Sequence, residues 1–246
     1  MTLLEVDGVT VRFGGVTAVS DASLGAAAGE VTGLIGPNGA GKTTMFNVVT
    51  GLQRPTAGAV RYAGTDITGL ATHERARRGI ARTFQRLEAF GSLSVWENVL
   101  VAAEIHARHG LRSRRAHRES PPETTERLIA KVGLHQYAKH PADTVPTGIA
   151  RLLELARALA LDPRLLLLDE PSSGLSAMET EVFGELLREL AGEGRAVLIV
   201  EHDMDLIMRV CDHIHVLNFG EVIASGPPAE VRADERVQRA YLGQLA

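Results

Sequence analysis

The loop over residues 36–44 constrains this chain more than any other feature. It follows the apolar run Val31–Ile35 and leads into a stretch with the character of a helix, Thr44–Thr50. Glycines in such a loop let successive backbone N–H groups point at phosphate oxygens, and the following helix adds the positive end of its dipole. The loop matches the phosphate-binding pattern G-x-x-x-x-G-K-[ST]. Its residues are Gly36-Pro37-Asn38-Gly39-Ala40-Gly41-Lys42-Thr43-Thr44.

Two side chains of this loop carry specific predictions. Lys42 is expected to reach the β- and γ-phosphates, and the hydroxyl of Thr43 is expected to bind Mg²⁺. The other residues expected to surround the phosphates are Asn38, Gly39, Ala40, Gly41 and Thr44. The loop therefore predicts that the chain binds Mg·ATP and hydrolyses it.

Two adjacent carboxylates supply the acidic partner that a phosphate loop needs. Asp169 and Glu170 directly follow the apolar run Leu165–Leu168, which is typical of a buried strand. Asp169 is expected to orient Mg²⁺ through water, and Glu170 is expected to polarise the attacking water as general base. A strand that merely runs into an acidic turn is the structural alternative for this pair.

Strand-like runs alternate with helix-like stretches, which predicts an α/β fold with a mainly parallel sheet. Such strands are covered on both faces by helices and are therefore nearly continuous apolar runs. Those expected here are Val31–Ile35, Leu165–Leu168, Val197–Val200 and Ile214–Leu217. Apolar residues at helical spacing over Glu179–Leu190 predict a helix that faces the core.

Two further regions depart from this alternation. Short runs at Leu3–Val9, Val16–Leu24 and Ala59–Tyr62 predict a small β layer around the parallel core. The middle of the chain, about Val95 to Leu161, has helical stretches with a Pro/Gly/Arg-rich interruption and no good strand. We expect this middle region to form a helical subdomain inserted into the α/β core.

Composition excludes several function classes. The net charge of −4 gives no electrostatic basis for a general nucleic-acid role. Cys211 is the single cysteine and cannot form an internal disulfide, and no charged-then-apolar leader opens the sequence, so a cytosolic location is expected. The apolar runs are far shorter than the roughly 20 residues of a membrane span. Any role at a membrane is therefore expected to be that of a peripheral protein, which contacts the membrane or its proteins from the aqueous side.

With both nucleotide motifs placed, the order of the remaining motifs resembles the ATP-binding-cassette (ABC) ATPases over essentially the whole chain. Gln85 resembles the glutamine of the Q-loop, which in the family contacts Mg²⁺ or the water and faces the membrane partner. His202 resembles the switch histidine that contacts the γ-phosphate. Phe13 resembles the aromatic residue that stacks on adenine, with a core residue of the β layer as the alternative. Ser173–Ser176 stands where the D-loop is expected.

This resemblance implies a P-loop NTPase (RecA-like) fold in a single domain over residues 1–246. Residues of about 1–85 and 162–246 are expected to form the N-terminal antiparallel β layer and the parallel-sheet core. Residues of about 86–161 are expected to form the helical subdomain, which carries the family's signature motif.

The signature motif itself departs from the family's L-S-G-G-Q. The matching stretch places Pro146 at the serine and Ile149 at the glutamine, with Thr147 and Gly148 between them. Proline is tolerated in the first turn of a helix, and the helix N-terminus would still direct its amides at the γ-phosphate on a second chain. Thr147 is a candidate for the missing hydroxyl. The alternative is a degenerate site with slow turnover. The D-loop also departs, with Ser176 where many members have aspartate.

Within the family, several stretches resemble the ATPase subunits of branched-chain amino acid importers. They are Ala81–Gln85, Leu93–Leu100, Val200–Met204 and Ala240–Gly243. The resemblance implies a second ABC ATPase chain, as homodimer or paralogous heterodimer, two membrane permease subunits, and indirectly a solute-binding protein. It implies a peripheral position at the cytoplasmic face of the inner membrane. Uptake systems for urea and other amides look similar, so the substrate stays open.

Three rival functions remain as alternatives. A non-transport ABC ATPase usually carries two cassettes in one chain or a long coiled-coil insertion, and the sequence has neither. A P-loop small-molecule kinase or GTPase would need no switch histidine or Q-loop, and a GTPase also needs an N-K-x-D motif, which the sequence lacks. A nucleotide-gated scaffold with slow hydrolysis is the third. The basic segment Arg108–Arg118 fits a solvated loop or, alternatively, a contact with anionic headgroups. No metal other than Mg²⁺ is expected.

Overall fold

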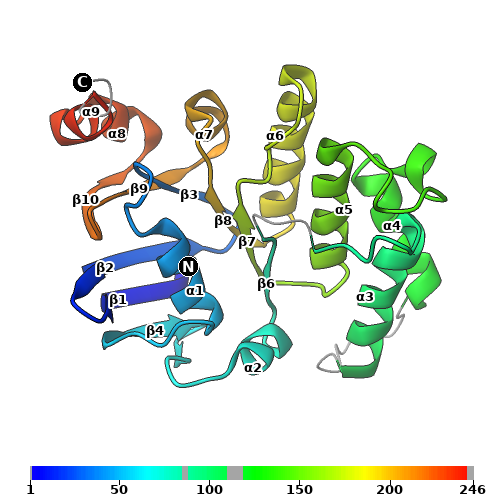
Figure 1. Cartoon of the computed structure of the whole chain (residues 1–246), viewed down its shortest axis with the longest axis horizontal. Helices are drawn as coiled ribbons and strands as arrows, with labels where there is room; N and C mark the ends of the chain where they lie inside the picture. The colour runs from blue at the N-terminus through cyan, green and yellow to red at the C-terminus, as the bar shows by residue number, and fades with distance from the viewer. Residues whose placement is uncertain (1, 85–87, 110–118, 243–246) are drawn as a thin grey trace.

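Two β-sheets and a group of helices make up the part of the chain that the computed structural model describes, residues 2–84, 88–109 and 119–242 (Figure 1). The larger sheet has six strands in the order β10-β9-β3-β8-β7-β6. Their bounds are β10 Glu221–Gly226, β9 His213–Asn218, β3 Val31–Ile35, β8 Ala196–Val200, β7 Leu165–Asp169 and β6 Ile80–Arg82. All neighbours in this sheet are parallel except the antiparallel pair β9–β10.

The smaller sheet is antiparallel, with the order β2-β1-β4-β5. Its strands are β1 Thr2–Phe13, β2 Val16–Ala27, β4 Ala57–Tyr62 and β5 Thr65–Asp66. The helices are α1 Lys42–Thr50, α2 Thr72–Arg77, α3 Val95–His109, α4 Pro121–Lys131, α5 Thr147–Leu159, α6 Ala177–Gly192, α7 Met204–Val210, α8 Pro228–Ala233 and α9 Glu235–Leu242, with a 3₁₀ turn at His135–Tyr137.

The four leucines of β7 explain why the strand is apolar throughout. Leu165 and Leu167 pack in the core between the two sheets, while Leu166 and Leu168 pack in the core on the opposite face, and all four are fully buried. Successive side chains of a strand point to opposite faces, so a strand covered on both sides must be apolar at every position. The four predicted parallel strands are confirmed: β3 has the predicted bounds, β7 and β8 are each one residue longer, and β9 extends one residue further at each end.

Helix α1 lies between the sheets. Its buried residues Met45, Phe46, Val48 and Val49 belong to the same core as the inner faces of β1, β2 and β4. The loop 36–41 therefore leaves the carboxyl end of β3 and enters a helix that is fixed on both sides. The residues that follow β7 and β8 emerge at this same edge, because the three strands are parallel and adjacent.

Helices α3, α4 and α5 lie together at one end of the molecule, beyond α6 and away from the antiparallel sheet (Figure 1). They share one buried core with the helix-covered face of the large sheet. We propose that residues of about 86–161, which contain these helices, form a subdomain that moves against the core.

Several elements of the structure had no sequence prediction. They are β5, β6, β10 and the helices α2, α7, α8 and α9. Most are short, and β6 has only three residues. Such segments are too short to display a helical or strand period, so their existence depends on the neighbours against which they pack.

Candidate active site

The backbone of the phosphate loop requires glycine at two positions. Gly36 has φ 149°, and a Cβ there would lie 1.9 Å from the carbonyl oxygen of Leu217. Gly41 has φ 108°, and a Cβ there would lie 2.6 Å from the carbonyl oxygen of Ala18. The loop is thus seated against β9 and β2, and any side chain at either position would displace it.

Lys42 is the first residue of α1, and its side chain turns back over the loop. Its Nζ donates hydrogen bonds to the carbonyl oxygens of Gly36, at 2.6 Å, and Pro37, at 3.0 Å. Burial lowers the pKa of Lys42, and the charges of Glu170 and Asp169 act in the opposite direction. The ammonium group therefore lies within electrostatic range of both predicted carboxylates.

The rest of the loop is open to an anion. Asn38, Gly39 and Thr43 are exposed, and α1 begins after Gly41 with no side-chain hydrogen bond at its N-terminus. The first amides of a helix lack intrahelical acceptors, so an uncapped N-terminus favours a bound anion. The loop, its ammonium group and the helix end together form a site with the chemistry that phosphates need.

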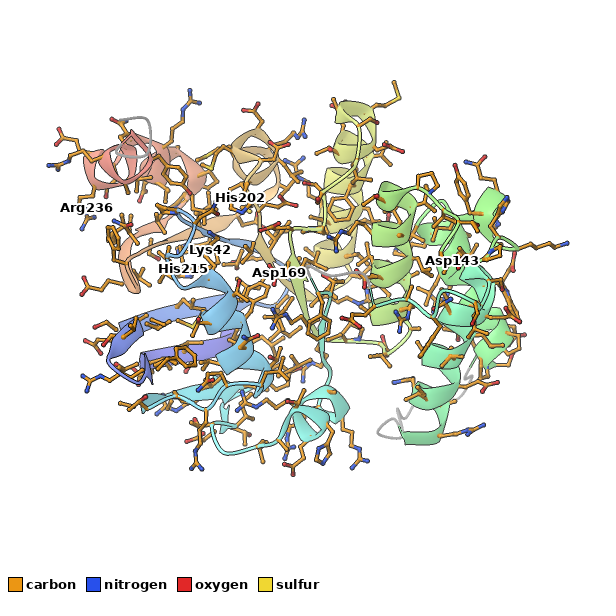
Figure 2. All side chains as sticks on the ribbon, viewed as in Figure 1. Lys42, Asp143, Asp169, His202, His215 and Arg236 are labelled. Atoms are coloured by element: carbon orange, nitrogen blue, oxygen red, sulfur yellow. The ribbon has the colours of Figure 1, made fainter. Side chains whose placement is uncertain are left out.

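Asp169 ends β7 and is only 2% exposed. Its backbone amide donates to the hydroxyl of Thr83 at 3.3 Å, and its Oδ2 accepts a hydrogen bond from Nη2 of Arg82 at 2.8 Å. Lys42, Asp169 and His202 all lie near the edge where β3, β7 and β8 end (Figure 2). The carboxylate of Asp169 is therefore buried and ion-paired at the end of the strand rather than exposed in a solvated turn.

Glu170 and His202 are in direct contact. Asp169 pairs with Val200 in the β7–β8 ladder, so the residues after these two strands emerge side by side. The Oε1 of Glu170 lies 2.9 Å from Nε2 of His202. Glu170 has φ 49° and donates its amide to the carbonyl oxygen of Val200 at 2.9 Å. A non-glycine residue at positive φ is uncommon and costs free energy, so the surrounding structure must hold Glu170 in place.

Glu201 was not assigned a role from the sequence, although it lies between two predicted positions. Its carboxylate is buried and accepts backbone amides from Ser172, at 2.7 Å, and from His202, at 3.1 Å. It therefore joins the segment after Glu170 to the segment that carries His202. A carboxylate directly after the apolar strand β8 was the available signal.

Phe13 ends β1 and is 51% exposed, so the core alternative for this residue is wrong. An exposed aromatic ring at a strand end is free to stack on a planar ligand.

Gln85, the predicted Q-loop glutamine, lies outside the described residues, and so does most of the basic segment that follows Arg108.

The predicted signature stretch forms the start of α5. Pro146 was expected in the first turn of this helix, but it is the N-cap, one residue before that turn begins. Thr147 is exposed, whereas Gly148 and Ile149 are buried, and Ile149 packs in the core. The helix has no side-chain cap, and its first intrahelical bond runs from the amide of Ala150 to Pro146 at 3.0 Å.

The start of α5 packs against the predicted D-loop. A Cβ at Gly148 would lie 2.8 Å from Cδ2 of Leu175 and 3.0 Å from the carbonyl oxygen of Gly174. Ser176, which replaces the family's aspartate, caps α6: Glu179 donates its amide to the serine hydroxyl at 3.3 Å and accepts the serine amide at 2.7 Å. The two departures from the family pattern are therefore neighbours in space.

The two predicted halves of the ATP site are not brought together within one chain. In Figure 1, α5 lies on the other side of β7 from α1.

Among residues 2–84, 88–109 and 119–242, no group of three or more His, Cys, Asp or Glu side chains is arranged to hold a metal ion. Thr43 and Asp169 offer the oxygen donors that Mg²⁺ prefers, and this ion usually takes few protein ligands. No helix in this described part is long and apolar enough to span a membrane.

Comparison with known proteins gives matches along nearly the whole chain. The ABC transporter family model matches residues 19–173, and a model described as branched-chain amino acid ATP-binding cassette transporter matches residues 221–245. BraF of Pseudomonas aeruginosa, a high-affinity branched-chain amino acid transport ATP-binding protein, is 42% identical over 250 residues, which cover 98% of each protein. LivG of Escherichia coli, which has the same description, is 40% identical with the same coverage.

Solved structures agree with these matches. The ADP conformation of MJ1267, an ATP-binding cassette of an ABC transporter, is 29% identical, with a TM-score of 0.85 over 99% of both chains. A dimeric post-hydrolysis state of the cassette MJ0796, bound to ADP and Pi, is 26% identical, with a TM-score of 0.80 over 92% of this chain and 99% of that one. The chain therefore belongs to the ABC transporter family, as one of its ATP-binding cassettes, and is an ATPase.

Proposed function

We propose that this chain hydrolyses ATP to power the uptake of branched-chain amino acids through separate permease subunits. The observation that carries the substrate class is the full-length similarity to BraF and LivG, together with the C-terminal match at residues 221–245. The site geometry supports the hydrolytic part, because a carboxylate and an imidazole meet beside the phosphate loop.

In this proposal the phosphate loop binds the nucleotide and helps to hold its metal. The amides of Asn38 to Thr44 receive the phosphate oxygens, and the Nζ of Lys42 exchanges its two backbone acceptors for the β- and γ-phosphates. Thr43 and Asp169, with Gln85, would hold Mg²⁺, which would neutralise charge on the phosphate oxygens. Phe13 stacks on the adenine.

Hydrolysis is assigned to the contact between Glu170 and His202. Glu170 accepts a proton from the attacking water, and His202 both orients this carboxylate and contacts the γ-phosphate. Lys42 stabilises the charge that develops on that phosphate. The positive φ of Glu170 fixes its side chain at the strand end, and Glu201 fixes the backbone of His202.

A second cassette, either a copy of this chain or a paralogue, completes each site. Pro146, Thr147 and Gly148 of the second chain contribute the uncapped start of α5 to the γ-phosphate. The dimeric state of MJ0796 supports this arrangement. Two permease subunits and, indirectly, a solute-binding protein are the further partners, and the complex places the chain at the cytoplasmic face of the inner membrane.

Purification of the chain from detergent-solubilised membranes, followed by reconstitution into liposomes, tests the proposal. We expect two permease chains to co-purify and ATP to drive leucine, isoleucine or valine uptake. Uptake should disappear in the matched Glu170→Gln complex. Recovery of ribosomes or DNA in place of permeases would contradict transport. A complex that transports only urea or other amides would contradict the substrate class.

A further inference from the structure

Arg82 has a contact that neither the motifs nor the family match assigns. It is the last residue of β6, and its side chain is 5% exposed. One end of its guanidinium, Nη2, donates to Oδ2 of Asp169 at 2.8 Å. The other end, Nη1, donates to Oδ1 of Asn47 on α1 at 2.6 Å. One planar group thus joins the strand that ends at Asp169 to the helix that begins at Lys42.

Two aromatic rings hold this guanidinium in place. Its Cζ lies 5.3 Å from the centroid of Phe46, a fully buried residue of α1, and 5.0 Å from the centroid of Phe84. Cations over aromatic faces are stabilised by the ring quadrupole. Because the strand, the helix and both rings restrain the head group, Arg82 holds the carboxylate of Asp169 in one orientation.

The local charge requires a cation at this place. Asp169 is buried beside Glu170, and burial of a carboxylate costs free energy unless a cation pairs with it and hydrogen-bonds to it. The ammonium of Lys42 donates its hydrogen bonds to two loop carbonyls. Arg82 is therefore the basic group in direct contact with Asp169 among the described residues.

We propose that Arg82 is a positioning residue for Mg²⁺: it holds Oδ2 of Asp169 and so keeps this carboxylate in the orientation in which it would serve the metal. The inference rests on the proposed role of Asp169. A lysine could supply the charge but not the fork, since the two acceptors lie on different elements and are met by two separate nitrogens, whereas lysine has one.

Arg82→Lys is the primary test, because it keeps the charge and removes the fork. Loss of a group that orients a metal ligand typically costs about 10–100-fold in metal affinity or activity. We expect the Mg²⁺ concentration for half-maximal ATP turnover to rise about tenfold, at the lower end of that range. We also expect a smaller increase in Tm when Mg²⁺ is added to the ATP-bound protein, which reports binding without turnover.

Arg75→Lys is the matched control. Arg75 is also a buried arginine that contacts α1, but it donates to the carbonyl oxygens of Val48 and Val49 at the far end of the helix. We expect it to lower the Tm and to leave both Mg²⁺ readouts unchanged. Equal changes in the two variants would mean that Arg82 is only structural and would overturn the proposal.

Asp169→Asn separates this proposal from the assignment of Asp169. We expect this variant to weaken the Mg²⁺ readouts itself and Arg82→Lys to add nothing in its background. An unaffected Asp169→Asn variant would contradict the metal role of Asp169. A weakened Asp169→Asn variant together with an unaffected Arg82→Lys variant would contradict the role of Arg82 alone.

A further variant keeps the test decisive if Arg82→Lys does not fold. Asn47→Ser leaves the ion pair intact and shortens the acceptor for Nη1. We expect it to raise the half-maximal Mg²⁺ concentration by less than Arg82→Lys would. No change at all would overturn the link between Asp169 and α1.

Discussion

The N-termini of α1 and α5 have the same proposed ligand, the phosphates of ATP, but they are built differently. Both begin without a side-chain cap. Helix α1 follows a loop in which Gly36 and Gly41 leave no room for a side chain, and it adds the ammonium of Lys42. Helix α5 follows Pro146 and offers one exposed hydroxyl, that of Thr147, next to the buried Gly148.

This difference shows which half of the site depends on side chains. The phosphate loop needs particular residues because its backbone path and its charge both act on the nucleotide. In the proposed dimer, the start of α5 would act mainly through its amides and the helix dipole, which many sequences provide. Its proposed role would therefore tolerate the departures at Pro146 and Ile149 from the family pattern.

The largest effect is expected from Glu170→Gln, which removes the base and preserves the shape of the side chain. Turnover at saturating ATP should fall at least about a hundredfold, the usual contribution of a general base, while ATP binding is retained. Steady-state phosphate release measures turnover, and an equilibrium nucleotide-binding assay measures ATP affinity. Glu179→Gln, at the exposed cap of α6, is the control and should leave turnover unchanged. Normal hydrolysis by Glu170→Gln would refute the assignment of the base.

The next effect separates the phosphate loop from the signature. Gly36→Ala puts a methyl group 1.9 Å from a backbone oxygen, so ATP affinity should fall more than about tenfold, or 1.4 kcal/mol. Isothermal titration with ATP measures this affinity. Gly69→Ala is the control, because a Cβ there meets no atom within 4 Å. Equal ATP affinities for the two variants would contradict the close packing of the phosphate loop against β9.

A smaller effect is expected at the signature. Thr147→Ala should lower turnover roughly tenfold, because a hydrogen bond to a charged group contributes about 1.5 kcal/mol or more. The assay is steady-state turnover of the complex with its second cassette. Thr144→Ala removes a nearby hydroxyl that donates to Pro141 in its own chain, and it should not change turnover. An unchanged Thr147→Ala variant would leave the proposed hydroxyl role without support.

The smallest effect concerns stability rather than chemistry. Ser176→Ala removes the cap of α6 and should lower the free energy of unfolding by about 1 kcal/mol, with ATP turnover preserved. Thr147→Ala removes no cap and should leave the free energy of unfolding unchanged. Urea denaturation of both variants measures this contrast. A loss of turnover in Ser176→Ala would mean that the serine also contacts the nucleotide site.

Motifs predicted the phosphate loop and its carboxylates because their requirements are local. Leu165–Leu168 reads as a strand in isolation, and Asp169 and Glu170 come directly after it. Arg82 could not be assigned in this way, and for Glu201 the position directly after β8 was a local signal that did not identify its partner. Arg82 and Asp169 are separated by 87 positions in the sequence. Their contact depends on the pairing of β6 with β7, and β6 is too short to predict. Glu201 acts on the amide of Ser172, 29 positions away.

The signature was only partly predictable for a related reason. The helix and its start were expected, but the cap position of Pro146 and the burial of Ile149 depend on packing. Ser176 was noted as a lost aspartate, whereas the structure uses it with Glu179 as a capping box. The spacing Ser176-x-x-Glu179 was the sequence signal for this cap.

Cross-linking tests most directly whether the two helix starts belong to one ATP site across two chains. Cys211 is buried, and burial raises its thiol pKa to about 12, so introduced cysteines will be the reactive ones. In a Glu170→Gln background, Asn38→Cys and Thr147→Cys should be joined between chains by a short bifunctional thiol reagent when ATP and Mg²⁺ are present. A covalent pair of cassettes that forms only with ATP is the predicted result. The shared ATP site would be contradicted if ATP binds but no covalent pair forms. This outcome would have to hold both for this chain alone and for this chain with an equivalently substituted co-purified cassette.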